Sequence, residues 1–209
     1  MELQIYLQDF LILIFAHFMA LISPGVDFFI IINSTLKYGR KAGFMSAFGI
    51  SIANLIYILL ALFGITIIKE NIYVFNSLKI LGSLYLFFIS YYLIQSKKRD
   101  LFNKHIKYEN ANNLFDSFIK GFISAVLNPK NFIFYFTMFS ITIEKSTPFS
   151  IQIIYALWMF FAVLIWDIFI VYVISLKKIK KIFNSYINLI EKISALFLTF
   201  IACMIIYKL

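Results

Sequence analysis

The stretch Ser23-Pro24-Gly25-Val26-Asp27 interrupts a long apolar run near the N-terminus, and it decides how the rest of the chain is interpreted. A second interruption, Asn128-Pro129-Lys130, stands at the corresponding place in the second half. Proline inside a helix removes one backbone N–H and clashes with the preceding turn, so each stretch predicts a helix break. In a bilayer, a break is tolerated only where the freed backbone groups are buried in protein or line a cavity. A pair of broken helices at matching places therefore indicates the binding site of a transporter built from two repeats.

The composition is that of an integral membrane protein. Of the 209 residues, 62% are hydrophobic and 14% are charged, and the mean hydropathy is +0.90. Soluble domains are about 45–50% apolar and about 25% charged. No stretch is long enough to form a separate soluble domain, so residues 1–209 are predicted to form a single membrane domain. Cys203 is the only cysteine, which excludes an internal disulfide and a zinc site built from cysteines. We expect no cofactor and no bound metal.

Six apolar stretches are long enough to span a membrane, which takes about 20 helical residues. They cover residues 6–32, 42–68, 72–95, 118–143, 149–176 and 187–207, with the first broken at Pro24 and the fourth at Pro129. Small residues in the second stretch, Gly49 among them, are predicted to allow close helix packing. Three spans per half is an odd number, so two repeats (about 1–100 and 101–209) would have opposite orientations in the membrane. The predicted fold is all-α, with six transmembrane helices as two inverted three-helix repeats.

Lysine and arginine are distributed unevenly among the linkers. The linkers after the first, third and fifth spans carry 14 of the 19 Lys and Arg residues, the opposite face carries 4, and Lys130 lies within a span. Cytoplasmic loops carry the excess of Lys and Arg. We therefore expect these three linkers in the cytoplasm and both termini on the outer face.

The two breaks supply the first candidate binding residues. In each, a helix-capping residue precedes a proline, which suits the first position of a helix, so Pro24-Gly25 and Asn128-Pro129 predict half-helices that start near mid-membrane. Their free N–H groups and dipoles favour an anion such as a carboxylate. Lys130 adds a formal positive charge at this place. The alternative is that both prolines are ordinary kinks, which membrane helices often contain.

Ionisable side chains within spans are costly, so each is a candidate for function. Asp27 is predicted to bind an ammonium group or a proton, the alternative being electrostatic support of the helix start. Asp167 in the fifth span is predicted to carry the coupling proton, with Lys130 as a candidate partner; the alternative is a structural hydrogen bond between helices. His17 is predicted to be packed or hydrogen-bonded, with a proton relay as the lesser alternative.

The order and spacing of several motifs resemble the lysine-exporter family (LysE/RhtB type) over nearly the whole chain. These motifs are Pro24-Gly25-Val26-Asp27, Gly39-Arg40-Lys41-Ala42-Gly43, Gly49, Gly64, Leu78-Lys79, Gly82, Tyr85-Leu86, Gly121-Phe122, Leu127-Asn128-Pro129-Lys130, Phe134 and Asp167. The resemblance implies an exporter of amino acids or related zwitterionic metabolites in the bacterial cytoplasmic (inner) membrane, driven by the proton motive force. The chain departs from the family pattern at Val26, where a second proline is usual, and at Tyr57, which replaces a histidine-type position and is predicted at the wall of the substrate cavity.

Two other function classes fit the sequence less well. A metal-ion exporter would need several carboxylate, Cys or His side chains within the spans, whereas this chain offers two carboxylates together with Lys130, which repels a cation. An intramembrane enzyme is suggested only by Gly49-Ile50-Ser51-Ile52-Ala53, a near match to a serine-nucleophile motif, and it would need a base such as His17 beside it. The predicted partners are a small zwitterion, protons and the lipid bilayer. Nucleic acid is not expected, and a homo-oligomer is left open.

Overall fold

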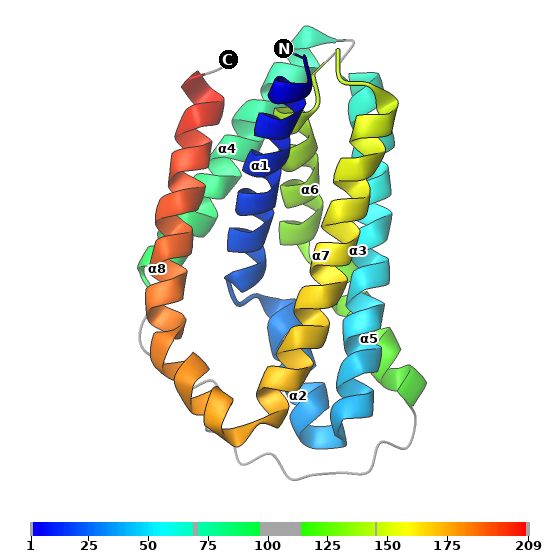
Figure 1. Cartoon of the computed structure of the whole chain (residues 1–209), viewed down its shortest axis with the longest axis vertical. Helices are drawn as coiled ribbons and strands as arrows, with labels where there is room; N and C mark the ends of the chain where they lie inside the picture. Colours follow the sequence, from blue (N-terminus) through cyan, green and yellow to red (C-terminus); the bar gives the residue numbers. More distant parts are fainter. Residues whose placement is uncertain (1, 69–70, 97–113, 145, 208–209) are drawn as a thin grey trace.

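The computed structural model of the chain describes residues 2–68, 71–96, 114–144 and 146–207. All regular structure in these ranges is α-helical, which confirms the predicted all-α class. In chain order, the helices are α1 (Glu2–Ile22), α2 (Val26–Tyr38), α3 (Arg40–Ile68), α4 (Ile72–Ile94), α5 (Leu114–Val126), α6 (Pro129–Thr142), α7 (Phe149–Ser175) and α8 (Lys177–Tyr207). The start of α1 and the end of α8 lie at the same end of the molecule (Figure 1).

Long apolar helices account for most of the predicted spans. Within the described residues, α3, α4, α7 and α8 are each long and apolar enough to cross a membrane, and the bent pair α1 and α2 makes a fifth if the two helices form one broken span. Residues 118–143 are not among these spans, because they are divided between α5 and α6, of 13 and 14 residues. The protein is thus a multi-pass membrane protein, while the sixth span and the inverted repeat remain predictions.

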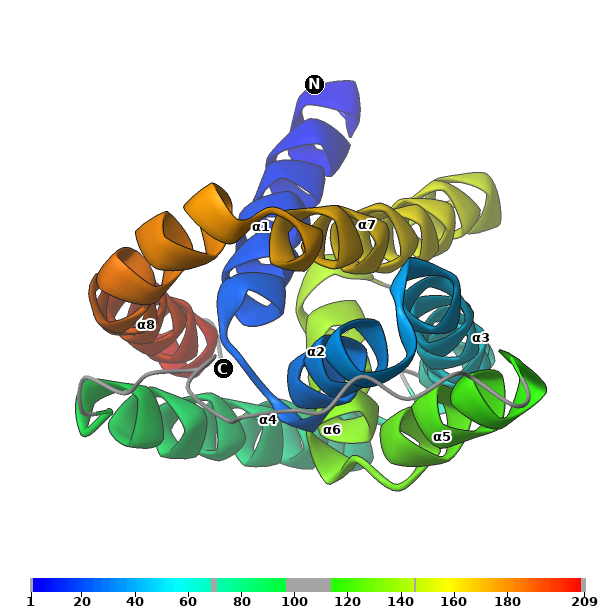
Figure 2. The ribbon, with the colours of Figure 1, turned by 90° about the horizontal axis from the view of Figure 1, so that it is seen from below.

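Both predicted helix breaks are present. The chain bends by 52° between α1, which ends at Ile22, and α2, which begins at Val26. The second break separates the end of α5 at Val126 from the start of α6 at Pro129. Figure 2 shows the short helices α2 and α6 near the centre of the bundle, with the longer helices around them. The breaks therefore place two helix starts inside the molecule.

The last helix is longer than predicted. Helix α8 begins at Lys177 and not near residue 187, so the basic stretch that we expected as a linker is helical. Apolar residues in this stretch recur at helical spacing, as Ile179, Ile182, Phe183 and Tyr186 illustrate. Only Ser185–Tyr207 is apolar enough to span a membrane, so the predicted span itself is found.

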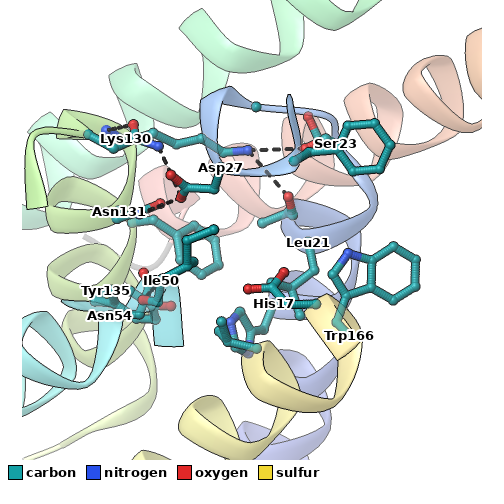
Figure 3. Close-up of a pocket in the computed structure, with 17 residues that line it drawn as sticks. His17, Leu21, Ser23, Asp27, Ile50, Asn54, Lys130, Asn131, Tyr135 and Trp166 are labelled. Carbon is teal, nitrogen blue, oxygen red and sulfur yellow. Dashed lines mark hydrogen bonds between the residues drawn. The ribbon is translucent and has the colours of Figure 1, made fainter. Parts of the chain in front are cut away.

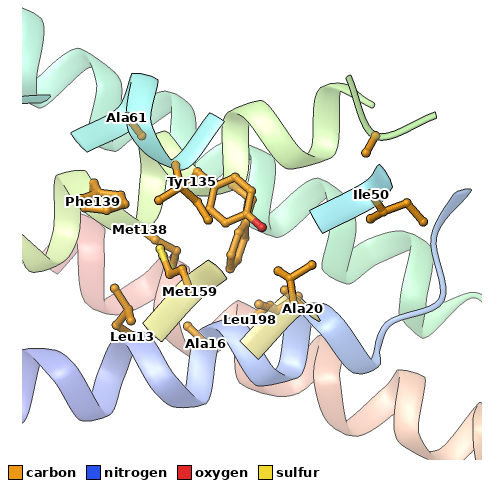
Figure 4. Packing of buried hydrophobic residues seen from close by; sticks show 14 of the residues in the cluster. Leu13, Ala16, Ala20, Ile50, Ala61, Tyr135, Met138, Phe139, Met159 and Leu198 are labelled. Carbon is orange, nitrogen blue, oxygen red and sulfur yellow. The ribbon is translucent and has the colours of Figure 1, made fainter. Parts of the chain in front are cut away.

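The two halves of the chain pack on a shared hydrophobic core. Leu13 and Ala16 of α1, Met138 and Phe139 of α6 and Met159 of α7 are fully buried members of one cluster between these helices (Figure 4). Helix α1 belongs to the first half, whereas α6 and α7 belong to the second. The core therefore holds the broken helices of both halves against each other.

Two glycines bring the backbones of α3 and α5 into contact. A Cβ at Gly49 would overlap the carbonyl oxygen of Phe118, and a Cβ at Gly121 would overlap the carbonyl oxygen of Ser46. Glycine is the residue that lets two helix backbones approach this closely. The predicted role of Gly49 in close packing is confirmed, and the contact joins the first half of the chain to the second.

Candidate functional site

A small cavity lies where the two breaks meet in the interior (Figure 3). Its walls are formed by both breaks and by side chains of α1, α2, α3, α6 and α7. The cavity has a volume of about 60 Å³. Several of its wall residues, Asp27 and Lys130 among them, are only half-buried, so the cavity is not sealed from the surface.

The second break has the predicted helix cap. Asn128 is the N-cap residue of α6, and its side-chain oxygen accepts a hydrogen bond from the backbone N–H of Lys130 at 3.1 Å. Pro129 is the first residue of the helix, where its missing N–H costs nothing. The cap formed by Asn128, which directly precedes the helix, thus fixes where α6 begins. Lys130 then lies in the first turn of α6, and it lines the cavity.

The first break is built differently from the prediction. The N-cap residue of α2 is Gly25, in an extended conformation and without a side-chain cap, so Ser23 is not the cap and Pro24 is not the first helical residue. The backbone N–H of Ser23 still donates to Met19 at 3.3 Å, which continues the hydrogen bonding of α1. The carbonyl oxygen of Ser23 has another partner, the side chain of Lys130. A contact from the other half of the chain thus shapes this break.

Lys130 reaches from the start of α6 to the end of α1. Its half-buried ammonium group donates to the carbonyl oxygens of Ala20 at 3.3 Å and Ser23 at 3.4 Å (Figure 3). The last carbonyls of a helix have no partner within it and carry the negative end of its dipole, so they suit a cation. Lys130 therefore neutralises the end of α1 in this structure.

Asp27 makes the reciprocal connection, from the start of α2 to the second break. One carboxylate oxygen accepts from the Ser124 hydroxyl at 3.0 Å. The other accepts from the side-chain amides of Asn128 at 3.3 Å and Asn131 at 2.8 Å. We call the hydrogen bonds of Asp27 and Lys130 across the two breaks the clasp. The predicted place of an anion at the two helix starts is thus taken by a carboxylate of the chain itself.

Three other polar side chains in the cavity wall have buried atoms without a partner. They are both ring nitrogens of His17, the side-chain oxygen of Asn54 and Oδ2 of Asp167, none of which has a hydrogen-bond partner among the described residues. His17 is packed, since its ring stacks on that of Phe134 with the centroids 5.6 Å apart. The suggested pairing of Asp167 with Lys130 is not found, because the Lys130 ammonium bonds to backbone carbonyls.

Tyr57 lies outside the cavity wall. Its hydroxyl donates a hydrogen bond to the carbonyl oxygen of Val126, the last residue of α5. The side chain thus stabilises the helix end just before the second break, and the predicted contact with the cavity is absent from this arrangement.

The sequence reasoning missed three polar residues at this place: Asn54 in the cavity wall, and Ser124 and Asn131 as partners of Asp27. Apart from the two breaks and Tyr57, only ionisable side chains within spans were taken as candidates. An amide side chain in an apolar run also needs a partner in lipid, so the same criterion applied to asparagine would have found Asn54 and Asn131.

Comparison with known proteins identifies relatives along almost the whole chain. The family model of the LysE type translocators matches residues 18–209. A leucine efflux protein of Klebsiella pneumoniae is 26% identical over 180 residues, which cover 80% of this chain and 83% of that protein. A threonine efflux protein of Salmonella typhi is 30% identical over 130 residues, which cover 60% of this chain and 62% of that protein. The uncharacterized membrane protein YahN of Escherichia coli is 22% identical over 187 residues, 89% of this chain and 83% of that protein. No solved structure matches the chain.

The family match confirms the resemblance seen in the motifs at both breaks, and it covers the residues that line the cavity from Ala20 to Asp167. The family is one of translocators and the relatives named here include efflux proteins, which agrees with the prediction of a transporter and not of an enzyme. The chain belongs to the LysE type translocators and is a transporter.

Proposed function

We propose that the chain is a secondary active exporter of amino acids or similar small zwitterions across the bacterial inner membrane. One observation carries this proposal: the cavity at the two breaks is lined by an ammonium group, from Lys130, and by the carboxylates of Asp27 and Asp167. A zwitterion presents both charges to such a site, whereas a metal ion would be repelled by Lys130. The names of the efflux relatives, for threonine and for leucine, support small amino acids as the substrate class.

We further propose that the fold consists of six spans in two inverted repeats, with α5 and α6 as the fourth span. A two-fold relation would pair α1–α2 with α5–α6, α3 with α7 and α4 with α8. Helices α3 and α7 pack on each other, as do α4 and α8, and the contact of α3 with α6 has its counterpart in that of α7 with α2. These pairings favour the repeat, although the contacts of α2 with α3, of α4 with α6 and of α1 with α8 have no counterpart of similar extent among the described residues.

In the proposed mechanism, the substrate carboxylate replaces the carbonyl oxygens at the end of α1 as the hydrogen-bond partner of the Lys130 ammonium group. The two hydrogen bonds of Lys130 in the clasp are long, at 3.3 and 3.4 Å, and both acceptors are uncharged. A carboxylate forms shorter and stronger charge-assisted hydrogen bonds with an ammonium group, so it outcompetes these carbonyls. Substrate binding would thereby open one half of the clasp and couple recognition to movement of the broken helices.

Coupling to protons would supply the driving force. One charge that moves across about 100 mV yields roughly 2.3 kcal/mol, enough to hold a gradient of about fiftyfold. Asp27 and Asp167 are the carboxylates that line the cavity, and they are the candidates for this proton.

The proposed function predicts faster release of specific amino acids from cells. Cells that produce the chain are loaded with dipeptides of threonine, leucine, lysine and alanine, and the free amino acids that appear outside are measured over time. We expect at least one of them to leave several-fold faster than from cells with the empty vector. Equal release of every amino acid tested would contradict the proposal.

The proposed orientation predicts which introduced cysteines an impermeant thiol reagent can label in intact cells. In a Cys203→Ala background, Ser146→Cys in the linker between α6 and α7 should react, because we place this exposed residue on the outer face with both termini. Ser96→Cys, just after α4, should react only after the cells are opened. The reverse pattern would overturn the orientation derived from the Lys and Arg distribution.

A further inference from the structure

The unpartnered atoms of His17, Asn54 and Asp167 lie in the wall of one cavity, on α1, α3 and α7. These side chains are 1%, 3% and 7% exposed, so solvent around the molecule does not satisfy them. More than nine in ten buried polar groups in proteins have a hydrogen-bond partner. Several orphaned groups at one cavity therefore point to a ligand that supplies the missing partners.

The chemistry of these atoms defines the ligand group. The amide nitrogen of Asn54 already donates to the backbone carbonyl of Ile50 at 2.9 Å, and its oxygen has no hydrogen-bond partner among the described residues. Carboxylate and amide oxygens only accept hydrogen bonds, and neutral imidazole offers one further acceptor. The missing partner must carry several N–H donors, and a positive charge suits the buried carboxylate of Asp167. A primary ammonium group, with three donors, meets the needs of these three acceptors, whereas the N–H of the imidazole is itself a donor and takes no part in this contact.

Asp27 is a poorer receptor for that ammonium group. Its two oxygens already accept hydrogen bonds from Ser124, Asn128 and Asn131, which use three of the roughly four acceptor sites of a carboxylate. Among the described residues of the cavity wall, Asp167 is thus the carboxylate with an oxygen free for a new partner.

We propose that Asp167 binds either the ammonium group of the substrate or the coupling proton, and that competition between the two at this carboxylate makes the protein an antiporter. This inference rests on the proposed function and reassigns the ammonium group from Asp27. A carboxylate oxygen that holds a proton cannot receive an ammonium group at the same time, so each crossing carries one or the other. For a net neutral amino acid, each cycle moves one proton inward per substrate exported, and one positive charge enters the cell.

Other titratable groups face the same cavity and must be separated from Asp167. They are His17 from α1, Asp27 from α2, and Lys130 and Tyr135 from α6. Helix α3 contributes Asn54, which does not titrate, and none of the described residues of α8 lines the cavity. His17 is the alternative proton site to be excluded, because it lies in the cavity wall and neither of its ring nitrogens has a hydrogen-bond partner among the described residues.

The test measures protons released when the purified protein binds L-leucine or L-threonine. In weakly buffered solution with a pH indicator dye, we expect up to one proton per substrate bound, and an apparent Kd that rises about tenfold per pH unit on the acid side. Asp167→Asn should abolish the release and raise the KM for exchange in proteoliposomes at least about tenfold, as expected when a charged hydrogen-bond partner is lost. The matched control Asp116→Asn makes the same change at an exposed residue of α5 outside the cavity wall, and it should retain the release.

Any of the following results would overturn the proposal that the proton and the ammonium group share Asp167. Binding of either amino acid to the unchanged protein without proton release contradicts it, and this measurement needs no variant to fold. Exchange in Asp167→Asn with an unchanged KM would place the substrate elsewhere, and loss of proton release in His17→Gln alone would make the imidazole the proton site. If the unchanged protein neither binds nor exports these amino acids or others, the proposed function itself fails, which distinguishes the two proposals.

Discussion

Replacing Lys130 by methionine should reduce the rate of amino-acid export at least about 100-fold, while the protein still reaches the membrane. The substitution keeps the length and the apolar part of the side chain but removes the ammonium group. The carbonyl oxygens of Ala20 and Ser23 lose their donor, and the proposed substrate carboxylate loses its partner. A 100-fold loss corresponds to about 2.7 kcal/mol, within the range for hydrogen bonds to charged groups.

The matched control is Lys120→Met. Lys120 is an exposed residue of α5, and its ammonium lies 5.2 Å from the ring centroid of Tyr38, away from the cavity. Export by this variant should stay within about twofold of the unchanged protein. Lys130→Arg should retain little export. The planar guanidinium group of arginine is wider than the compact ammonium group of lysine, and it does not fit in the same way between the two carbonyl oxygens. Near-normal export from Lys130→Met, at equal protein in the membrane, would leave Lys130 with a structural role only.

The second large effect is expected on stability, from Gly121→Ala. A Cβ at this position overlaps backbone atoms of Ser46 in α3, which cannot move aside as the end of a side chain can. Alanine otherwise favours a helix over glycine by about 1 kcal/mol. A net loss of about 2 kcal/mol or more would therefore come from forced separation of α3 and α5. The measurement is the thermal midpoint of the detergent-purified protein, together with its monodisperse fraction on gel filtration.

Gly25→Ala makes the same chemical change where space is available. The nearest atom to a Cβ at Gly25 is the Lys130 ammonium nitrogen at 3.7 Å, an ordinary van der Waals distance. This variant should have the thermal midpoint of the unchanged protein. If Gly121→Ala is as stable as Gly25→Ala, the backbone contact between α3 and α5 does not limit stability.

The features that depend on local chemistry were predictable from the sequence. Pro24 and Pro129 break helices wherever they stand in a long apolar run, and Asn128 caps the helix that directly follows it. The family resemblance was also readable, because its motifs are short and ordered along the chain. The same reasoning failed at Ser23, which has the right residue type for a cap but whose carbonyl is held by Lys130 from the other half.

The partners of the candidate site residues depend on how distant segments meet. Nothing near Asp27 in the sequence indicates that Ser124 and Asn131 will donate to its carboxylate. Tyr57 illustrates the same limit, since a tyrosine in an apolar helix can turn toward a cavity or toward a helix end. It turns toward Val126, where the last carbonyls of α5 lack partners within their own helix. Such choices are settled by tertiary contacts between helices.

The glycine contact between α3 and α5 also limits how the molecule can change shape. Helices that touch through backbone atoms cannot slide past each other without first separating, so α3 and α5 must travel as one body although they belong to different halves. Tyr57 ties the end of α5 to that same body. The places where the chain can bend include the linkers after Ile22 and after Val126 and the connection at Gly39 between α2 and α3. If the cavity opens to each side of the membrane in turn, α1, α2 and α6 would then tilt while α3 and α5 keep their positions relative to each other.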